Sequence, residues 1–233
     1  MKALVQRLAL AAPLAIAGGC FAATPAPPRS DAPLYDPNQL PSFSGVVRQF
    51  TLTPRGDIDG FVLADGEEVK TPPHLSSQIA YAVRPGDTVV VHGLKAEALP
   101  LIKAMSVTDA ASHRTVVDAG PPGPPRGAAP PPPPANAAPG AATLVKGRVT
   151  MPLHGPKGDL NGALLDDGLI VRLPPSEAER VASLLQPGQP LAARGAELRT
   201  DLGSVLDAEA IGASPDHMEA VQDPPPPPPP PRP

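Results

Sequence analysis

The chain contains the same stretch twice, and this duplication limits its possible folds more than any other feature. When the sequence is shifted by 102 positions, 16 of the 50 residues between Ser44 and Gly93 fall on an identical residue, and no gap is needed. Sequences of average composition would match at about one position in sixteen. A repeat at a fixed period indicates two copies of one structural unit. We therefore predict two domains of the same fold, at residues 42–109 and 143–213.

Most of the matching residues are those that form turns and bends. In the first copy they include Gly45, Pro54, Gly56, Asp57, Gly60, Asp65, Gly66, Pro72, Pro73, Pro85, Gly86 and Gly93. Glycine, proline and aspartate at such offsets mark loops, and Asp-Gly is a strong hairpin signal. The segments between them are apolar and rich in β-branched residues, as strands are. The spacing of Leu75, Ile79, Ala82 and Val83 instead predicts a short helix.

Each copy is thus predicted to run strand, strand, strand, helix, strand, strand. In the first copy we expect strands at 42–52, 60–63, about Val69, 88–92 and 101–108, with a helix at 74–83. In the second copy we expect strands at 145–153, 162–165, 169–173, 191–196 and 205–211. A capping box formed by Ser176 and Glu179 predicts the start of the second helix, which should end at Leu185.

This order of elements is that of the OB-fold. With the motifs named above, the chain resembles the small exported OB-fold proteins of Gram-negative bacteria. The resemblance covers both repeats and implies an all-β fold with one short helix per domain. It predicts two tandem OB-fold-like, five-stranded Greek-key barrels joined by a Pro-rich linker. An SH3-like barrel is the nearest alternative, but it lacks this helix.

Residues 1–22 have the features of an export signal. Lys2 and Arg7 precede an apolar run, Leu8–Ala17, that is too short to span a bilayer. The following Gly-Gly-Cys resembles the lipobox of bacterial lipoproteins, in which the cysteine, here Cys20, becomes lipidated. Ordinary signal-peptidase cleavage after Ala22 is the alternative. Both predict an exported protein, either soluble in the periplasm or anchored as a lipoprotein in the outer or inner membrane.

Three proline-rich segments flank the repeats, at residues 23–41, 110–142 and 214–233. They hold most of the 38 prolines of the chain, and the last contains eight in a row, Pro224–Pro231. Such segments favour polyproline II, an extended and soluble spacer. We interpret them as a tether, a disordered linker and a disordered tail. A ligand for a polyproline-binding groove is the alternative.

The loop between the first two strands lines the ligand face in OB-folds. In this chain it carries Gly-Asp-x-[Asp/Asn]-Gly in both copies, which resembles half of a calcium loop. The full set of oxygen ligands does not recur in the second copy, so turn formation is the better interpretation. Aromatic residues beside the loop are candidates for stacking. The predicted ligand-binding residues are Asp57, Asp59, Phe50, Phe61, Asp159 and Asn161.

The sequence contains no motif for catalysis. The histidines do not recur between the copies or show zinc-ligand spacing, and surface or helix-capping positions are predicted for them. We expect no enzyme activity, metal or cofactor. The function predicted is a non-catalytic binding or scaffold protein of the bacterial cell envelope, whose partner is an envelope protein or a small ligand.

A protein that binds single-stranded DNA or RNA through an OB-fold is the alternative function. It would act mainly through the first copy, because the second contains no Phe, Tyr or Trp. The net charge of −4, with more acidic than basic residues in each copy, argues against nucleic acid as the partner.

Overall fold

The computed structural model describes residues 36–120 and 142–222, all of which belong to one compact unit of the chain. The predicted signal peptide with Cys20 lies outside the described residues, as does most of the predicted tether, linker and tail. Among the residues that are described, no helix is both long and apolar enough to cross a membrane.

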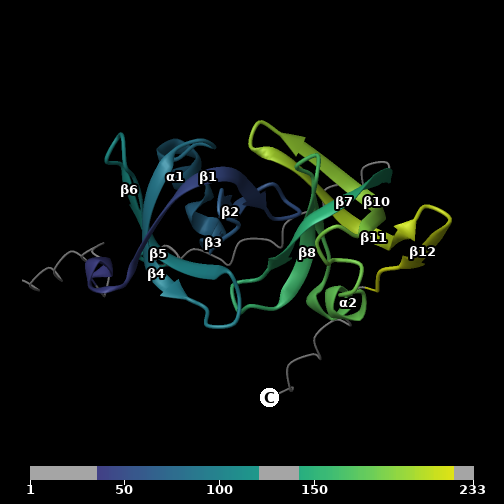
Figure 1. The fold of residues 1–233 in the computed structure, drawn as a ribbon. Helices are drawn as coiled ribbons and strands as arrows, with labels where there is room; N and C mark the ends of the chain where they lie inside the picture. The colour runs from purple at the N-terminus through teal and green to yellow at the C-terminus, as the bar shows by residue number, and fades with distance from the viewer. Residues whose placement is uncertain (1–35, 121–141, 223–233) are drawn as a thin grey trace, which may run out of the picture. The chain divides into compact units, whose positions relative to one another are not determined.

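The first repeat forms a closed barrel of five strands (Figure 1). Strand β1 (Ser42–Leu52) pairs with β4 (Thr88–Lys95) along its first half and with β2 (Ile58–Leu63) along its second. Strand β2 then pairs with β3 (Glu68–Lys70). The barrel closes because β5 (Leu101–Asp109) pairs in parallel with β3 and antiparallel with β4. This strand order, with a helix between the third and fourth strands, is the OB-fold.

The helix between β3 and β4 follows two prolines. A short 3-10 turn, η2 (Pro73–Leu75), leads into α1 (Ser76–Ala82), close to the predicted helix at 74–83. Ile79 and Ala82 are buried on its inner face, as their spacing predicts. A second 3-10 turn, η1 (Pro37–Gln39), precedes β1.

The second repeat builds the same barrel. Its strands are β7 (Thr143–His154), β8 (Leu160–Leu165), β9 (Ile170–Arg172), β10 (Pro190–Thr200) and β11 (Gly203–Ser214). The pairing of the first two strands repeats residue for residue: Phe50 lies opposite Phe61, and Pro152 lies opposite Ala163. Strands β9 and β11 pair in parallel to close the barrel. The prediction of two five-stranded OB-fold barrels is confirmed.

One glycine that both copies share is required by the close approach of two strands. Both barrels have a register shift in the pairing of the fourth and fifth strands, at Gly93 and at Gly195. A Cβ atom added to Gly93 would lie 2.2 Å from the Lys103 carbonyl oxygen, and one added to Gly195 would lie 1.8 Å from that of Asp207. No side chain fits there, so both copies keep glycine.

Each barrel also has a sixth strand in addition to the five of the predicted barrel. Strand β6 (Thr115–Val117) pairs with β5, and β12 (His217–Ala220) pairs with β11. These strands fall in the segments predicted as linker and tail, so the ordered part of each repeat extends further than predicted. His113, in the turn before β6, has a positive φ of 58°.

The second helix differs from the prediction. Helix α2 (Pro175–Arg180) begins after Pro174, which makes no side-chain capping bond. The predicted capping box of Ser176 and Glu179 is therefore wrong, and the helix ends at Arg180 instead of Leu185. The residues that follow form turns, although Leu185 is buried as the helical spacing suggested.

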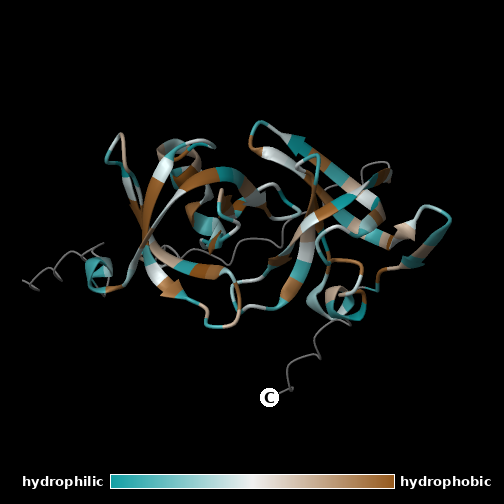
Figure 2. Cartoon of the chain, in the orientation of Figure 1, coloured by the Kyte–Doolittle hydropathy of each residue, from teal (hydrophilic) through white to brown (hydrophobic). Residues whose placement is uncertain are grey.

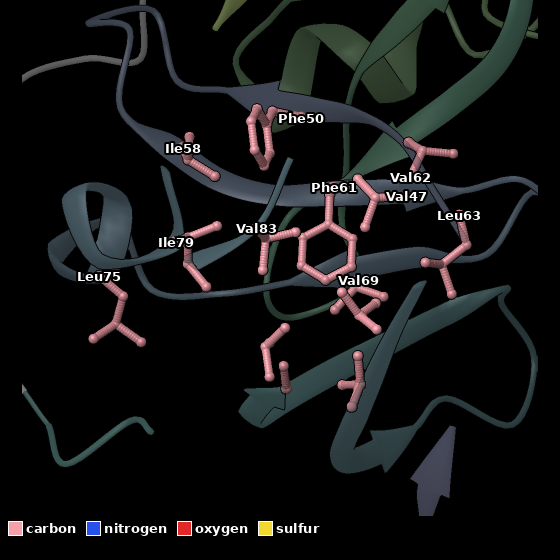
Figure 3. Close-up of a cluster of buried hydrophobic side chains, with 14 of the residues drawn as sticks. Val47, Phe50, Ile58, Phe61, Val62, Leu63, Val69, Leu75, Ile79 and Val83 are labelled. Atoms are coloured by element: carbon pink, nitrogen blue, oxygen red, sulfur yellow. The ribbon is translucent and has the colours of Figure 1, made fainter. Parts of the chain in front are cut away.

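Hydrophobic residues alternate with hydrophilic ones along the strands (Figure 2), which directs one face of each strand into the barrel. Figure 3 shows the core of the first barrel, where Val47, Val69 and Val83 lie around Phe61. Phe50 is 4% exposed and Phe61 is 0% exposed. Both rings therefore fill the core, and neither has the exposed face that the predicted stacking contact with a ligand needs.

Candidate functional site

The loop between the first two strands of each barrel is a tight turn, as its aspartates suggested. The Asp57 carbonyl accepts a hydrogen bond from the Thr53 N–H at 2.8 Å, and the Asp159 carbonyl accepts one from the Gly155 N–H at 2.7 Å. The Thr53 hydroxyl also accepts a hydrogen bond from the Asp57 N–H, at 3.2 Å. The backbone atoms of Asp57 and Asp159 thus close these turns.

Asp59 and Asn161, two residues further on, are brought together by one arginine. Arg172 on β9 donates from Nη2 to both carboxylate oxygens of Asp59, at 2.9 and 2.8 Å, and from Nη1 to Asn161 Oδ1 at 2.8 Å. Its Nε donates to the Leu52 carbonyl at 2.8 Å. Arg172 belongs to the second barrel, whereas Asp59 and Leu52 belong to the first. The two barrels are therefore in contact at these predicted residues.

A second contact between the barrels joins Glu68 to His154. The Glu68 carboxylate is 0% exposed and accepts hydrogen bonds from the His154 N–H, at 3.0 Å to Oε2. His154 Nδ1 lies 3.2 Å from the same oxygen. Lys70 connects the two contacts, with its Nζ 3.2 Å from Glu68 Oε1 and 3.0 Å from Asp59 Oδ2. His154 was predicted at the surface or at a helix cap, and this is wrong because it is buried.

We call these five residues, Asp59, Glu68, Lys70, His154 and Arg172, the interbarrel cluster. With His154 neutral it contains two carboxylates and two cations, so its formal charges balance. Among the described residues, the buried side-chain atoms that lack a partner are Thr71 Oγ1 and Asp109 Oδ2, and neither is in the cluster. A buried ionic group of this kind is tolerated because each charge has a partner.

Apolar residues surround the interbarrel cluster. The core of the first barrel continues into the second, because Leu153, Leu164, Ile170 and Val205 belong to the same hydrophobic cluster as Leu52 and Phe61. Gln49 in the first barrel adds a hydrogen bond from Nε2 to the Gly168 carbonyl at 3.2 Å. The contact between the barrels thus combines a charged centre with continuous apolar packing.

The loops at the ends of the barrels contact each other in a reciprocal way. A Cβ atom added to Gly56, in the first loop of barrel one, would lie 2.9 Å from Leu198 in the last hairpin of barrel two. A Cβ atom added to Gly158, in the first loop of barrel two, would lie 3.3 Å from Leu99 before the last strand of barrel one. Within the cluster, Asp59 lies on β2, Glu68 and Lys70 on β3, Arg172 on β9, and His154 at the end of β7. Strands β2 and β3 of the first barrel are equivalent to β8 and β9 of the second. We call these four strands the facing strands.

A cavity of about 390 Å³ lies beside the cluster. Its lining includes Thr53 and Asp59 from the first barrel and Asn161, Arg172 and Pro174 from the second. Two of the predicted ligand-binding residues, Asp59 and Asn161, therefore share one cavity. Within residues 36–120 and 142–222, no three His, Cys, Asp or Glu side chains are grouped so that they could hold a metal ion.

The exposed aromatic residue of the first barrel lies away from the cluster. Tyr81 on α1 is 71% exposed, and the Arg114 guanidinium lies 4.7 Å from the centre of its ring. Phe43 is half-buried, with Lys95 Nζ 5.9 Å from its ring centre. These rings do not form a continuous stacking surface with Phe50 and Phe61, which are buried.

The charge of Asp59 gives a prediction about acid. Burial by itself would raise the pKa of this carboxyl, but Arg172 and Lys70 beside it, with a hydrogen bond from Thr51, hold the pKa below its ordinary value of 3.8. Because the folded state favours the charged form, Asp59 stabilises the fold above pH 3.8, and the contribution is lost as the pH falls through the pKa of the folded state.

Urea unfolding from neutral pH to below pH 3.8 tests this in the wild type and in Asp59→Asn. We expect the variant to be less stable at neutral pH and to lose less stability in acid, so that the two curves converge. Parallel pH dependence in the two proteins would contradict the role given to Asp59.

Sequence reasoning missed four of the five residues of the cluster. Glu68, Lys70, His154 and Arg172 carry no motif, and the shift of 102 positions aligns each with a different residue type. One signal for the contact was available in the sequence. Charged residues stand in or directly before predicted strands of both copies, an acid at Asp59 in the first copy and a base at Arg172 in the second.

No family model and no curated protein matches the chain. Among solved structures it is similar to the wild-type single-stranded DNA binding protein from Thermus aquaticus, with 14% identity over 79% of this chain and 93% of that chain, at a TM-score of 0.23. A deletion mutant of the same protein is similar with 14% identity, 79% and 95% coverage and a TM-score of 0.23. A likeness this weak says nothing about the ligand, and the OB-fold assignment rests on the strand order and barrel closure described above.

Proposed function

We propose that the protein is an exported, lipid-anchored and non-catalytic binding or scaffold protein of the bacterial cell envelope. Its two OB-fold barrels act as one body, and its partner is an envelope protein or a small ligand. The ionisable groups of the interbarrel cluster are buried against one another, so they hold the barrels together instead of serving as acids or bases.

The observation that carries the proposal is that the facing strands of each barrel are in contact with the other barrel. In OB-folds the second and third strands, with the loops at their ends, form the usual ligand face. Here Asp59 on β2 is bonded to Arg172 on β9, and Glu68 on β3 is bonded to His154. The other barrel therefore contacts each ligand face and leaves the cavity beside Asp59 and Asn161 open between them. A partner would therefore meet the outer surfaces of the barrels, where Tyr81 and Arg114 are exposed.

The proposal of a lipid anchor rests on the sequence before the barrels. Cys20 is the single cysteine of the chain and follows two glycines and an apolar run. Mass spectrometry of the mature N-terminus tests it. A diacylglyceryl group on Cys20 is the expected result, whereas a chain that begins at Ala23 would contradict the anchor and leave export in place.

Single-stranded DNA is not expected to bind. Its bases would need exposed rings on which to stack, but Phe50 and Phe61 are buried and the facing strands contact the other barrel. Titration of the full chain with a labelled oligonucleotide at low salt should give no saturable binding in the micromolar range. Micromolar binding that weakens steeply with added salt would favour the nucleic-acid alternative and contradict this proposal.

A further inference from the structure

The two barrels differ from each other at the positions that meet, on the facing strands and at the ends of β1 and β7. Glu68 in the first barrel corresponds to Ile170 in the second, and Leu52 corresponds to His154. In the structure Glu68 bonds to His154, an acid with a base. Leu52 and Ile170 lie in the same apolar cluster. At these positions the polar side chains of the two barrels are paired with each other, and the apolar ones share one cluster.

Pairing of two identical faces would lose this match. Because the contacts are reciprocal, two first-barrel faces would place the carboxylate of Glu68 against Leu52, and two second-barrel faces would place His154 against Ile170. Each mismatch would occur twice and would leave the Glu68 or His154 side chain without its partner on the other barrel, although Lys70 would still face Glu68. The Asp59–Arg172 contact does not distinguish unlike from like faces. Lys70 in barrel one is equivalent to Arg172 in barrel two, so both barrels carry a cation at this position.

The bonds between the barrels that involve described residues connect strand and turn residues of one barrel to those of the other. The hydrogen bonds and ion pairs across the contact connect residues between Gln49 and Glu68 to residues between His154 and Arg172. The contact thus has the form of an interface between two proteins.

We propose that the facing strands of barrel one bind those of barrel two in preference to a second copy of themselves. The barrel that is bound can belong to the same chain or to a second copy of it. Two copies then form a closed dimer with two identical contacts, in which each barrel pairs with the opposite barrel of the other copy. The connecting segment gives the two barrels of one chain a high effective concentration, so the wild type closes within one chain when dilute. This inference does not depend on export, anchoring or the proposed partner.

Two variants of the full chain test the proposal. Asp59→Arg places a cation against Arg172, and Arg172→Asp places an acid against Asp59, so neither chain can close on itself. When the two are mixed, each barrel finds an oppositely charged face on the other chain. We expect monomers from each variant alone and a twofold increase in mass in the mixture, measured by light scattering after size exclusion. The double variant D59R/R172D should be a monomer again.

The other outcomes count against the proposal. If the mixture stays monomeric while circular dichroism shows both variants folded, pairing between chains is excluded. If Arg172→Asp alone forms dimers, like faces pair and the selection by Glu68 and His154 is wrong. If either variant fails to fold, refolding of the wild-type chain at increasing concentration decides. A dimer fraction that rises with concentration supports the proposal, and monomer at every concentration overturns it.

Discussion

Replacing Arg172 with methionine is expected to lower the free energy of unfolding by about 3 kcal/mol, which is typical of breaking a buried ion pair from one side. The change leaves the Asp59 carboxylate, the Leu52 carbonyl and Asn161 without the donors that Arg172 supplies. Lys70 still faces Asp59, which places the expected loss at the lower end of the range for such pairs. Equilibrium unfolding in urea at neutral pH measures it.

Arg180→Met is the matched control for this prediction. Arg180 also pairs with carboxylates, Glu177 and Glu219, but its side chain is 40% exposed. An exposed pair contributes at most about 1 kcal/mol. Adding Asp59→Asn to Arg172→Met should recover part of the lost stability, because no unpaired charge is then buried. Equal effects of the Arg172 and Arg180 variants would contradict the importance given to the interbarrel cluster.

Phe61→Ala should cost about 4 kcal/mol of stability, because it removes a fully buried ring from a closed core. Tyr81→Ala is the control, since Tyr81 is 71% exposed and its loss should change stability by less than about 1 kcal/mol. Urea unfolding of both variants against the wild type gives the comparison. A Phe61 variant as stable as the Tyr81 variant would restore the interpretation of Phe61 as a surface ring.

Calorimetry of the Phe61 variant also tests how the two barrels are coupled. Phe61 shares its hydrophobic cluster with Leu153 and Ile170 of the second barrel. We expect the wild type to unfold in one transition and the Phe61 variant to do so at a lower temperature. Two separate transitions, of which one keeps its wild-type temperature, would indicate that the barrels are independent.

The barrels could be predicted because the residues that form their turns can be recognised in the sequence. Asp65-Gly66 and Pro85-Gly86 each mark a reversal of the chain, and both pairs occur again 102 positions later. Strand β1 has the predicted bounds, Ser42–Leu52, because its alternating pattern is bounded by Pro41 and Pro54. Local chemistry of this kind decides where strands begin and end.

The sixth strands and the contact between the barrels could not be found in the same way. Strands β6 and β12 have unrelated sequences, so comparing the copies does not reveal them. The residues of the interbarrel cluster differ between the copies because their partners lie on the other barrel. Comparison of the repeats finds what the barrels share, whereas the contact depends on how they differ. Glu68 and His154 are 86 residues apart, and only the fold brings them together.

The asymmetry of the facing strands limits how the gene can evolve. A truncation that removed either half would expose a surface whose buried charges had lost their partners, so neither half can be discarded alone. Substitutions at Asp59 and Arg172, or at Glu68 and His154, should be inherited as pairs. Two copies that began as interchangeable have thus become obligate complements.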